Sequence, residues 1–100
     1  MKYEVKTEID SKELKGRRLK FDWGYQTKEW TGTIIDVILA GYRPSPNQLK
    51  NFYNNKWPAG ADRAITVDRV LVEYFDSEDE EKHKIVIPLN RGGRLHWNLV

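Results

Sequence analysis

The chain has 100 residues, of which 17 are Lys or Arg, 15 are Asp or Glu and none is Cys. This length suits one globular domain over 1–100, and the lack of cysteine excludes a disulfide framework, a thiolate zinc site and a cysteine nucleophile. A formal net charge of +2 is not that of a protein that wraps DNA, and 39% hydrophobic with 12% aromatic residues is typical of a folded chain.

The first sixteen residues predict a strand and a short turn. Residues 1–10 alternate apolar and charged side chains, which indicates a strand with one buried face, and 11–16 predict the turn. The segment is too charged for a signal peptide, and the longest apolar run, at 37–41, is too short to span a bilayer. We therefore expect no membrane association and a cytoplasmic protein, or a nuclear one in a eukaryote.

A hairpin is predicted next. The alternation resumes over 17–23, a polar segment led by glycine at 24–29 predicts a connection, and 30–39 is a strand rich in β-branched residues. Gly32 within this strand is expected to mark a bulge or a close approach of the neighbouring backbone. The near-continuous apolar residues after it indicate that both faces of the strand are covered in part.

The middle of the chain predicts one short helix. Ser45 and Pro46 suit an N-cap and a first helical position, and apolar residues at i, i+3, i+4 and i+8 from Leu49 predict a helix over about 46–56. Pro58 closes it. A helix of this length is marginal alone, so packing against the sheet must stabilise it.

The last third predicts three more strands. They are expected over 64–75, with a break near residues 68 and 69, and over 83–89 and 94–100. An acidic loop at 76–81 separates the first two, and turn residues at 90–93 predict a hairpin between the last two. Pro88 lacks an amide N–H, which suits an edge strand.

Together these elements predict a mainly β fold with a minor helical part. About six strands joined by short connections favour an antiparallel sheet, closed as a small barrel or strongly curled to protect its edges. The segments 16–21 and 30–37 resemble the first hairpin of SH3-like barrels of the Tudor and KOW type, which implies the same fold for this part of the chain. The insertion at 41–60 departs from that pattern. An exposed strand at 83–89 leaves both a monomer and a homodimer open.

Catalytic chemistry is not indicated. The serines lie at predicted caps or in the acidic loop, and the chain has no glycine-rich phosphate-binding motif. His83 and His96 are expected on the two arms of the last hairpin, where they could approach each other, but two strand histidines are more often solvated than metal-bound. The acidic loop lacks the ligand spacing of a calcium loop. We therefore predict no enzyme activity, no cofactor and no metal site.

Aromatic and basic residues alternate around the first hairpin and the last turn. Exposed rings beside Lys and Arg are what single-stranded nucleic acid requires, because bases stack on rings while phosphates contact the charges. The predicted ligand-binding residues are Arg17, Arg18, Lys20, Trp23, Tyr25, Trp30, Arg91 and Arg94. The same rings could enclose a methylated lysine, or Phe21 and Trp30 could fill the core while the charges only solubilise the surface.

The sequence therefore predicts a non-catalytic β-rich binding module, with nucleic acid as the first ligand class. The alternative is a protein–protein interaction module, such as an adaptor or a small inhibitor. It would use the acidic loop 76–81 and the helix 46–57, where several asparagines offer specific hydrogen bonds. Neutralising the acidic loop separates the two hypotheses, since only a protein partner would lose contacts.

Overall fold

The computed structural model describes residues 11–24, 28–54, 56–90 and 95–100, without the side chains of residues 11 and 12. The strand predicted over 1–10 and most of the turn predicted at 90–93 lie outside the described residues. The elements in chain order are α2 (Ser11–Leu14), β1 (Arg18–Asp22), β2 (Trp30–Ile38), α3 (Pro46–Tyr53), β3 (Arg69–Asp76), β4 (Glu81–Pro88) and β5 (His96–Leu99).

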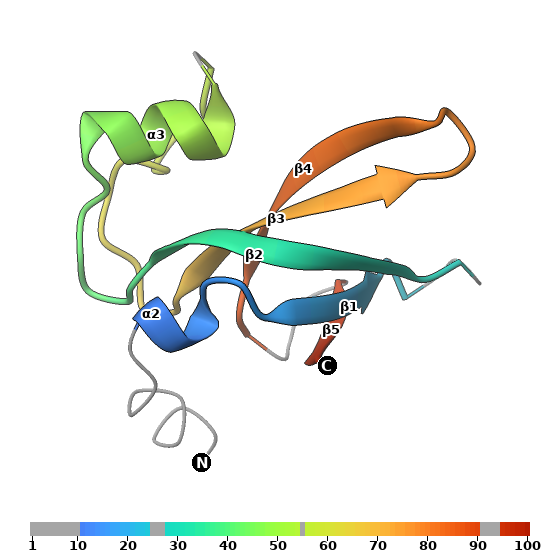
Figure 1. Cartoon of the computed structure of the whole chain (residues 1–100). Helices are drawn as coiled ribbons and strands as arrows, with labels where there is room; N and C mark the ends of the chain where they lie inside the picture. Colours follow the sequence, from blue (N-terminus) through green and yellow to red (C-terminus); the bar gives the residue numbers. More distant parts are fainter. Residues whose placement is uncertain (1–10, 25–27, 55, 91–94) are drawn as a thin grey trace.

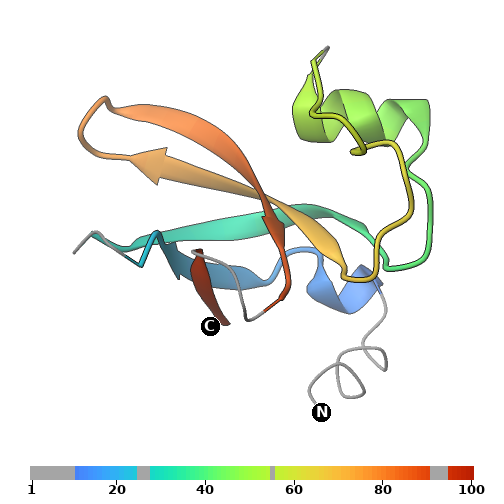
Figure 2. The same ribbon diagram turned by 180° about the vertical axis from the view of Figure 1, so that it is seen from behind.

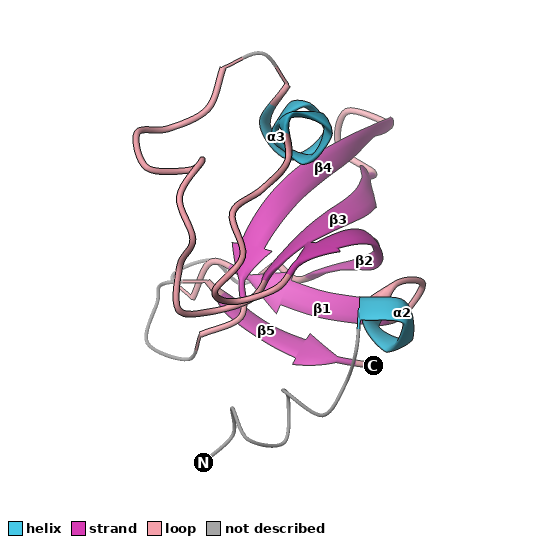
Figure 3. Cartoon of the chain, turned by 90° about the vertical axis from the view of Figure 1, so that its left-hand side faces the viewer, coloured by secondary structure: helices cyan, strands magenta, loops and turns pink. Residues whose placement is uncertain are grey.

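The five strands form one antiparallel sheet. Their order across the sheet is β4-β3-β2-β1-β5, and Figure 3 shows them fanned in this sequence. The predicted mainly β fold with an antiparallel sheet and a short helix is confirmed. Within the described residues, no helix has the length and apolar character needed to cross a membrane.

The hairpin predicted between the last two strands is wrong. β5 pairs with β1, with Trp97 opposite Phe21 and Leu99 opposite Leu19, so β4 and β5 lie at opposite edges of the sheet. His83 and His96 are consequently on different edges and do not meet. The physical reason is burial: pairing with β1 places the apolar side of β5 on the largest core cluster.

The main core lies on one face of the sheet. Alternating residues of the strands supply it, and Leu14 of α2 closes one end. Its fully or nearly buried members are Leu14, Leu19, Phe21, Ile34, Val37, Val70, Val72, Ile87, Leu89 and Trp97. Figures 1 and 2 show α2 below the strands and α3 above them, at the same end of the sheet.

The helix α3 covers part of the opposite face. Phe52 packs there with Ile38 and Leu71, and the N-terminus carries a capping box in which Ser45 and Gln48 accept each other's backbone N–H groups. The helix ends at Tyr53, earlier than predicted, because Asn54 adopts a positive φ of 61° while its N–H still bonds to the helix.

The structure decides between the two alternatives predicted for Gly32 and shortens one predicted strand. The register shift of β2 falls between Ile34 and Asp36, so the bulge is not at Gly32; Gly32 instead marks the predicted close approach, since a Cβ there would lie 2.5 Å from Val72 Cγ1. The strand predicted over 64–75 begins only at Arg69, close to the predicted break. The carboxylate of Asp68, just before the strand, accepts the N–H of Ala40 at 2.7 Å.

Candidate functional site

The predicted basic residues of the first hairpin are exposed. Arg18 and Lys20 lie two residues apart in β1, on the face that points away from the core, while Leu19 between them is fully buried. Arg17 directly precedes the strand, and its carbonyl accepts the N–H of Ile34 at 2.9 Å. Of the other predicted site residues, Tyr25, Arg91 and Arg94 lie outside the described residues.

Trp30 lies on the core face and does not join these cations. Its ring stacks on Phe21 at a centroid distance of 5.8 Å and meets the edge of Tyr74 at 6.2 Å. The ammonium of Lys28 lies 5.3 Å from the centre of the indole ring. Trp23, one residue after β1, is half-buried. The structure therefore brings Arg18 and Lys20 together but separates Trp30 from them by the thickness of the sheet.

The outer face of the sheet is the one that points away from the main core. On the part of this face that α3 does not cover, the pairing of the strands aligns side chains into two rows. Directly opposed residues of antiparallel strands share a face, so each row can be followed from strand to strand. The first row contains Arg18, Thr33, Glu73 and Lys84. The second contains Asn98, Lys20, Thr31, Phe75 and Lys82. We call these two rows the outer patch.

The outer patch is basic. Its four cationic side chains, Arg18, Lys20, Lys82 and Lys84, are all exposed, and Glu73 is its single carboxylate. Lys20 also makes a long ion pair, 4.0 Å, with Glu29, in which both side chains are about half exposed. Such an exposed pair is worth little and leaves the lysine available to another anion.

Phe75 places an aromatic ring within the outer patch. The residue is 56% exposed and lies opposite Lys82 in the register of β3 and β4. On its other side, Phe75 and Thr31 are each one residue beyond the opposed pair of Tyr74 and Gly32. Phe75, Lys82 and Lys84 were not predicted as site residues. Strand alternation could have suggested Phe75, but only the register shows which cations flank it.

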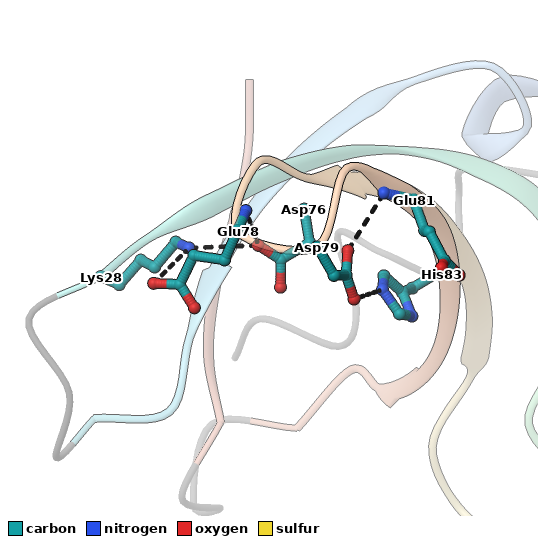
Figure 4. A network of polar contacts seen from close by, with 6 residues as sticks. All are labelled: Lys28, Asp76, Glu78, Asp79, Glu81 and His83. Carbon is teal, nitrogen blue, oxygen red and sulfur yellow. Dashed lines mark hydrogen bonds and ion pairs between the residues drawn. The ribbon is translucent and has the colours of Figure 1, made fainter.

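The acidic turn between β3 and β4 is held by a separate polar network (Figure 4). Lys28 lies 3.2 Å from carboxylate oxygens of both Asp76 and Glu78. At the other end, His83 and Asp79 are joined by a 2.7 Å hydrogen bond, and Asp79 also accepts the N–H of Glu81 at 3.0 Å. Part of the negative charge of the turn is thus neutralised by Lys28, on the Trp30 side of the sheet.

The network shifts the pKa values of three side chains. A hydrogen bond from the Glu78 amide, followed by the contact with Lys28, holds the pKa of Asp76 below its ordinary value. Desolvation lowers the pKa of Lys28, but its hydrogen bonds with Glu78 and Asp76 outweigh this and leave the pKa raised. Burial, reinforced by Asp76 and Asp79, raises the pKa of Tyr74. These shifts describe a stabilised ion-pair network rather than a poised acid or base.

Three side chains of the same turn are close enough together to contact one metal ion. Potential ligand atoms of Asp76, Asp79 and His83 lie within 4.8 Å of one another. Both aspartates already have partners, because Asp76 contacts Lys28 and a backbone amide while Asp79 contacts His83 and another amide. This geometry satisfies the carboxylates without an ion and supplies no argument for one.

Comparison with known proteins gave no relative: no family model, no curated protein and no solved structure matches this chain. The outer patch is therefore the candidate site on the evidence of its own geometry.

Proposed function

We propose that this protein is a non-catalytic binding module for single-stranded nucleic acid, which it contacts through the outer patch. The exposed ring of Phe75 among four cations is the observation that carries the proposal. A base stacked on the exposed ring of Phe75 would remove that ring from water and gain the stacking energy. Cations on both sides would contact the backbone phosphates on either side of that base.

The spacing of the outer patch supports this ligand. Arg18 in β1 and Lys84 in β4 are separated by three strand spacings, about 14 Å at 4.7–4.9 Å per strand. Phe75 lies in β3, between the cations of β1 and those of β4. Thr31, Thr33 and Asn98 add hydroxyl and amide groups that can hydrogen-bond to sugars and base edges.

The proposal retains Arg18 and Lys20 from the sequence prediction and adds Phe75, Lys82 and Lys84. Trp30 is left out because it packs on Phe21 and Tyr74.

The test is fluorescence anisotropy with labelled single-stranded oligonucleotides of mixed sequence, in DNA and RNA form. We expect Phe75→Ala to weaken binding by about 1–3 kcal/mol, the range for loss of one stacked base. Tyr42→Ala is the matched control, because Tyr42 is 67% exposed in the loop before α3 and outside the outer patch. Equal losses in both variants, or no binding by the unmodified protein, would overturn the proposal.

The dependence of oligonucleotide affinity on salt concentration tests the contacts between the four cations and the phosphates. Four phosphate contacts on a single strand predict a slope of about −3 for log K against log salt concentration. Replacing Lys82 and Lys84 by Ala should reduce this slope by about 1.4. Replacing Lys50 and Lys56, which are exposed in and after α3, should leave it unchanged.

A protein partner bound through the acidic turn is the competing function. Asp79, Glu80 and Glu81 are exposed there and available to a basic surface. Replacing them by Asn or Gln should leave nucleic-acid binding intact or strengthen it, because long-range repulsion of phosphate is removed. Weaker oligonucleotide binding in this variant would mean that the acidic turn contacts the nucleic acid, and would contradict binding through the outer patch.

A further inference from the structure

A pocket lies where the end of α3, the 58–61 segment and β4 meet. Its volume is about 330 Å³. The walls are mainly apolar, with Pro58, Ile65, Val86 and Pro88 among the lining residues, and Tyr53 contributes an aromatic ring. Ligand pockets are typically about 300–1,000 Å³, so this one matches a molecule built around a single ring or branched chain.

Among the described residues that line this pocket, Arg69 is the one with a charged side chain. It is only 4% exposed at the start of β3. Its Nη1 donates to the carbonyl of Ala61 at 2.8 Å and to the hydroxyl of Tyr53 at 3.4 Å, and its Nη2 donates to the carbonyl of Arg63 at 3.2 Å. These contacts tether the 61–63 segment to the sheet.

The tethering role leaves two properties of Arg69 unexplained. Its Nε is buried without a hydrogen-bond partner, and no carboxylate of the described residues forms an ion pair with its guanidinium. A guanidinium stays charged at any pH that a protein tolerates. A buried cation satisfied only by neutral acceptors is costly, because burial removes hydration that an anion would otherwise replace.

We propose that the pocket binds a small carboxylic acid with an apolar body, whose carboxylate pairs with Arg69 while its hydrocarbon part fills the apolar walls. A carboxylate is the natural complement, since guanidinium and carboxylate form charge-assisted, bidentate hydrogen bonds. The pocket lies at the α3 end of the sheet and shares no residue with the outer patch. The inference is therefore independent of nucleic-acid binding.

Two ligands of the same shape, one charged and one neutral, test the role of the ligand carboxylate without any mutation. Titration with phenylacetate, followed by ¹H–¹⁵N NMR of the full chain, should give saturable shifts of the amides of Gly60, Ala61 and Val86. Phenylacetamide, which has the same shape but no charge, should bind about tenfold more weakly. Equal affinity for the acid and the amide would overturn the role of Arg69, and no shift with either would overturn the site.

A blocking variant tests the place of binding. Ala59 lines the pocket and is exposed, so Ala59→Phe should fill the space without disturbing the core and abolish the shifts. Ala64→Phe, also exposed but outside the lining, is the matched control and should bind as the unmodified protein does. Arg69→Gln should lose the preference for the acid, and because it also removes a tether, its fold must first be checked by NMR. Undiminished binding in Ala59→Phe would contradict the inference.

Discussion

Tyr74 and Phe75 are consecutive in β3, yet their rings lie on opposite faces of the sheet. The Tyr74 ring meets the edge of Phe21 at a centroid distance of 5.1 Å, whereas Phe75 is 56% exposed. The pleat of the strand enforces this separation. It places Tyr74 among the aromatic residues of the core and leaves the ring of Phe75 exposed on the outer face.

The two residues form a matched pair for a stability test. Tyr74→Ala should lower the free energy of unfolding by about 2 kcal/mol, because it removes ring contacts with Phe21 and Trp30 from a half-buried site. Phe75→Ala should change it by less than about 0.5 kcal/mol, as an exposed substitution does. Urea denaturation measures both. A loss in Phe75→Ala as large as that in Tyr74→Ala would mean that Phe75 is packed in solution.

Gly32 has no room for a side chain. A Cβ at this position would lie 2.5 Å from Val72 Cγ1 and 2.6 Å from the carbonyl oxygen of Glu73, so β2 and β3 would have to separate. We expect Gly32→Ala to destabilise the protein by about 2–3 kcal/mol. Thr31→Ala on the outer face is the control and should cost less than about 1 kcal/mol. Similar thermal unfolding of the two variants would show that the strands move apart easily.

Asp76 should contribute to stability in a pH-dependent way. Its pKa is held below the ordinary 3.8, first by the Glu78 amide and then by Lys28. The unfolded chain therefore takes up this proton at a higher pH than the folded chain, so the contribution is complete above about pH 4 and is lost as the pH falls through the folded pKa.

Asp76→Asn keeps the acceptor oxygen for the Glu78 amide and removes the charge. The variant should be less stable at neutral pH, and its melting temperature should fall less steeply below about pH 4 than that of the unmodified protein. Asp62→Asn, the same substitution at an exposed position outside the network, is the control. If the melting temperatures of the unmodified protein and of Asp76→Asn fell equally steeply below pH 4, the lowered pKa of Asp76 would be contradicted.

The N-terminus of α3 depends on Ser45. Its hydroxyl accepts the N–H of Gln48 at 3.2 Å, and the Gln48 side chain accepts the N–H of Ser45 at 3.0 Å. Ser45→Ala should destabilise the protein by about 1 kcal/mol, as loss of an N-cap does. Ser77→Ala, exposed in the acidic turn, is the control.

Because Tyr53 at the end of α3 lines the pocket, we also expect Ser45→Ala to weaken phenylacetate binding.

Local patterns predicted much of this fold. Alternation at Leu19 and Phe21 identified the buried side of β1, because a strand turns successive side chains to opposite faces whatever its neighbours are. Ser45 with Pro46 identified the start of α3, since capping is a contact between residues three apart. The antiparallel sheet followed from the short connections between strands.

Tertiary contacts decided the rest. The partner of β5 is β1, which precedes it by more than seventy residues, and no local signal near Trp97 distinguishes that pairing from a hairpin with β4. The buried Arg69 is likewise invisible in the sequence, because its acceptors belong to the separate 61–63 segment and to α3.

The candidate site shows the same division. Composition shows only that the chain contains basic and aromatic residues, whereas assigning Trp30 to the core and Phe75 to the surface requires the register of four strands. Register is set by the free energy of burying one complete face of the sheet, which is a property of all strands together. The sequence therefore establishes which side chains alternate, and only the assembled sheet establishes which of them meet.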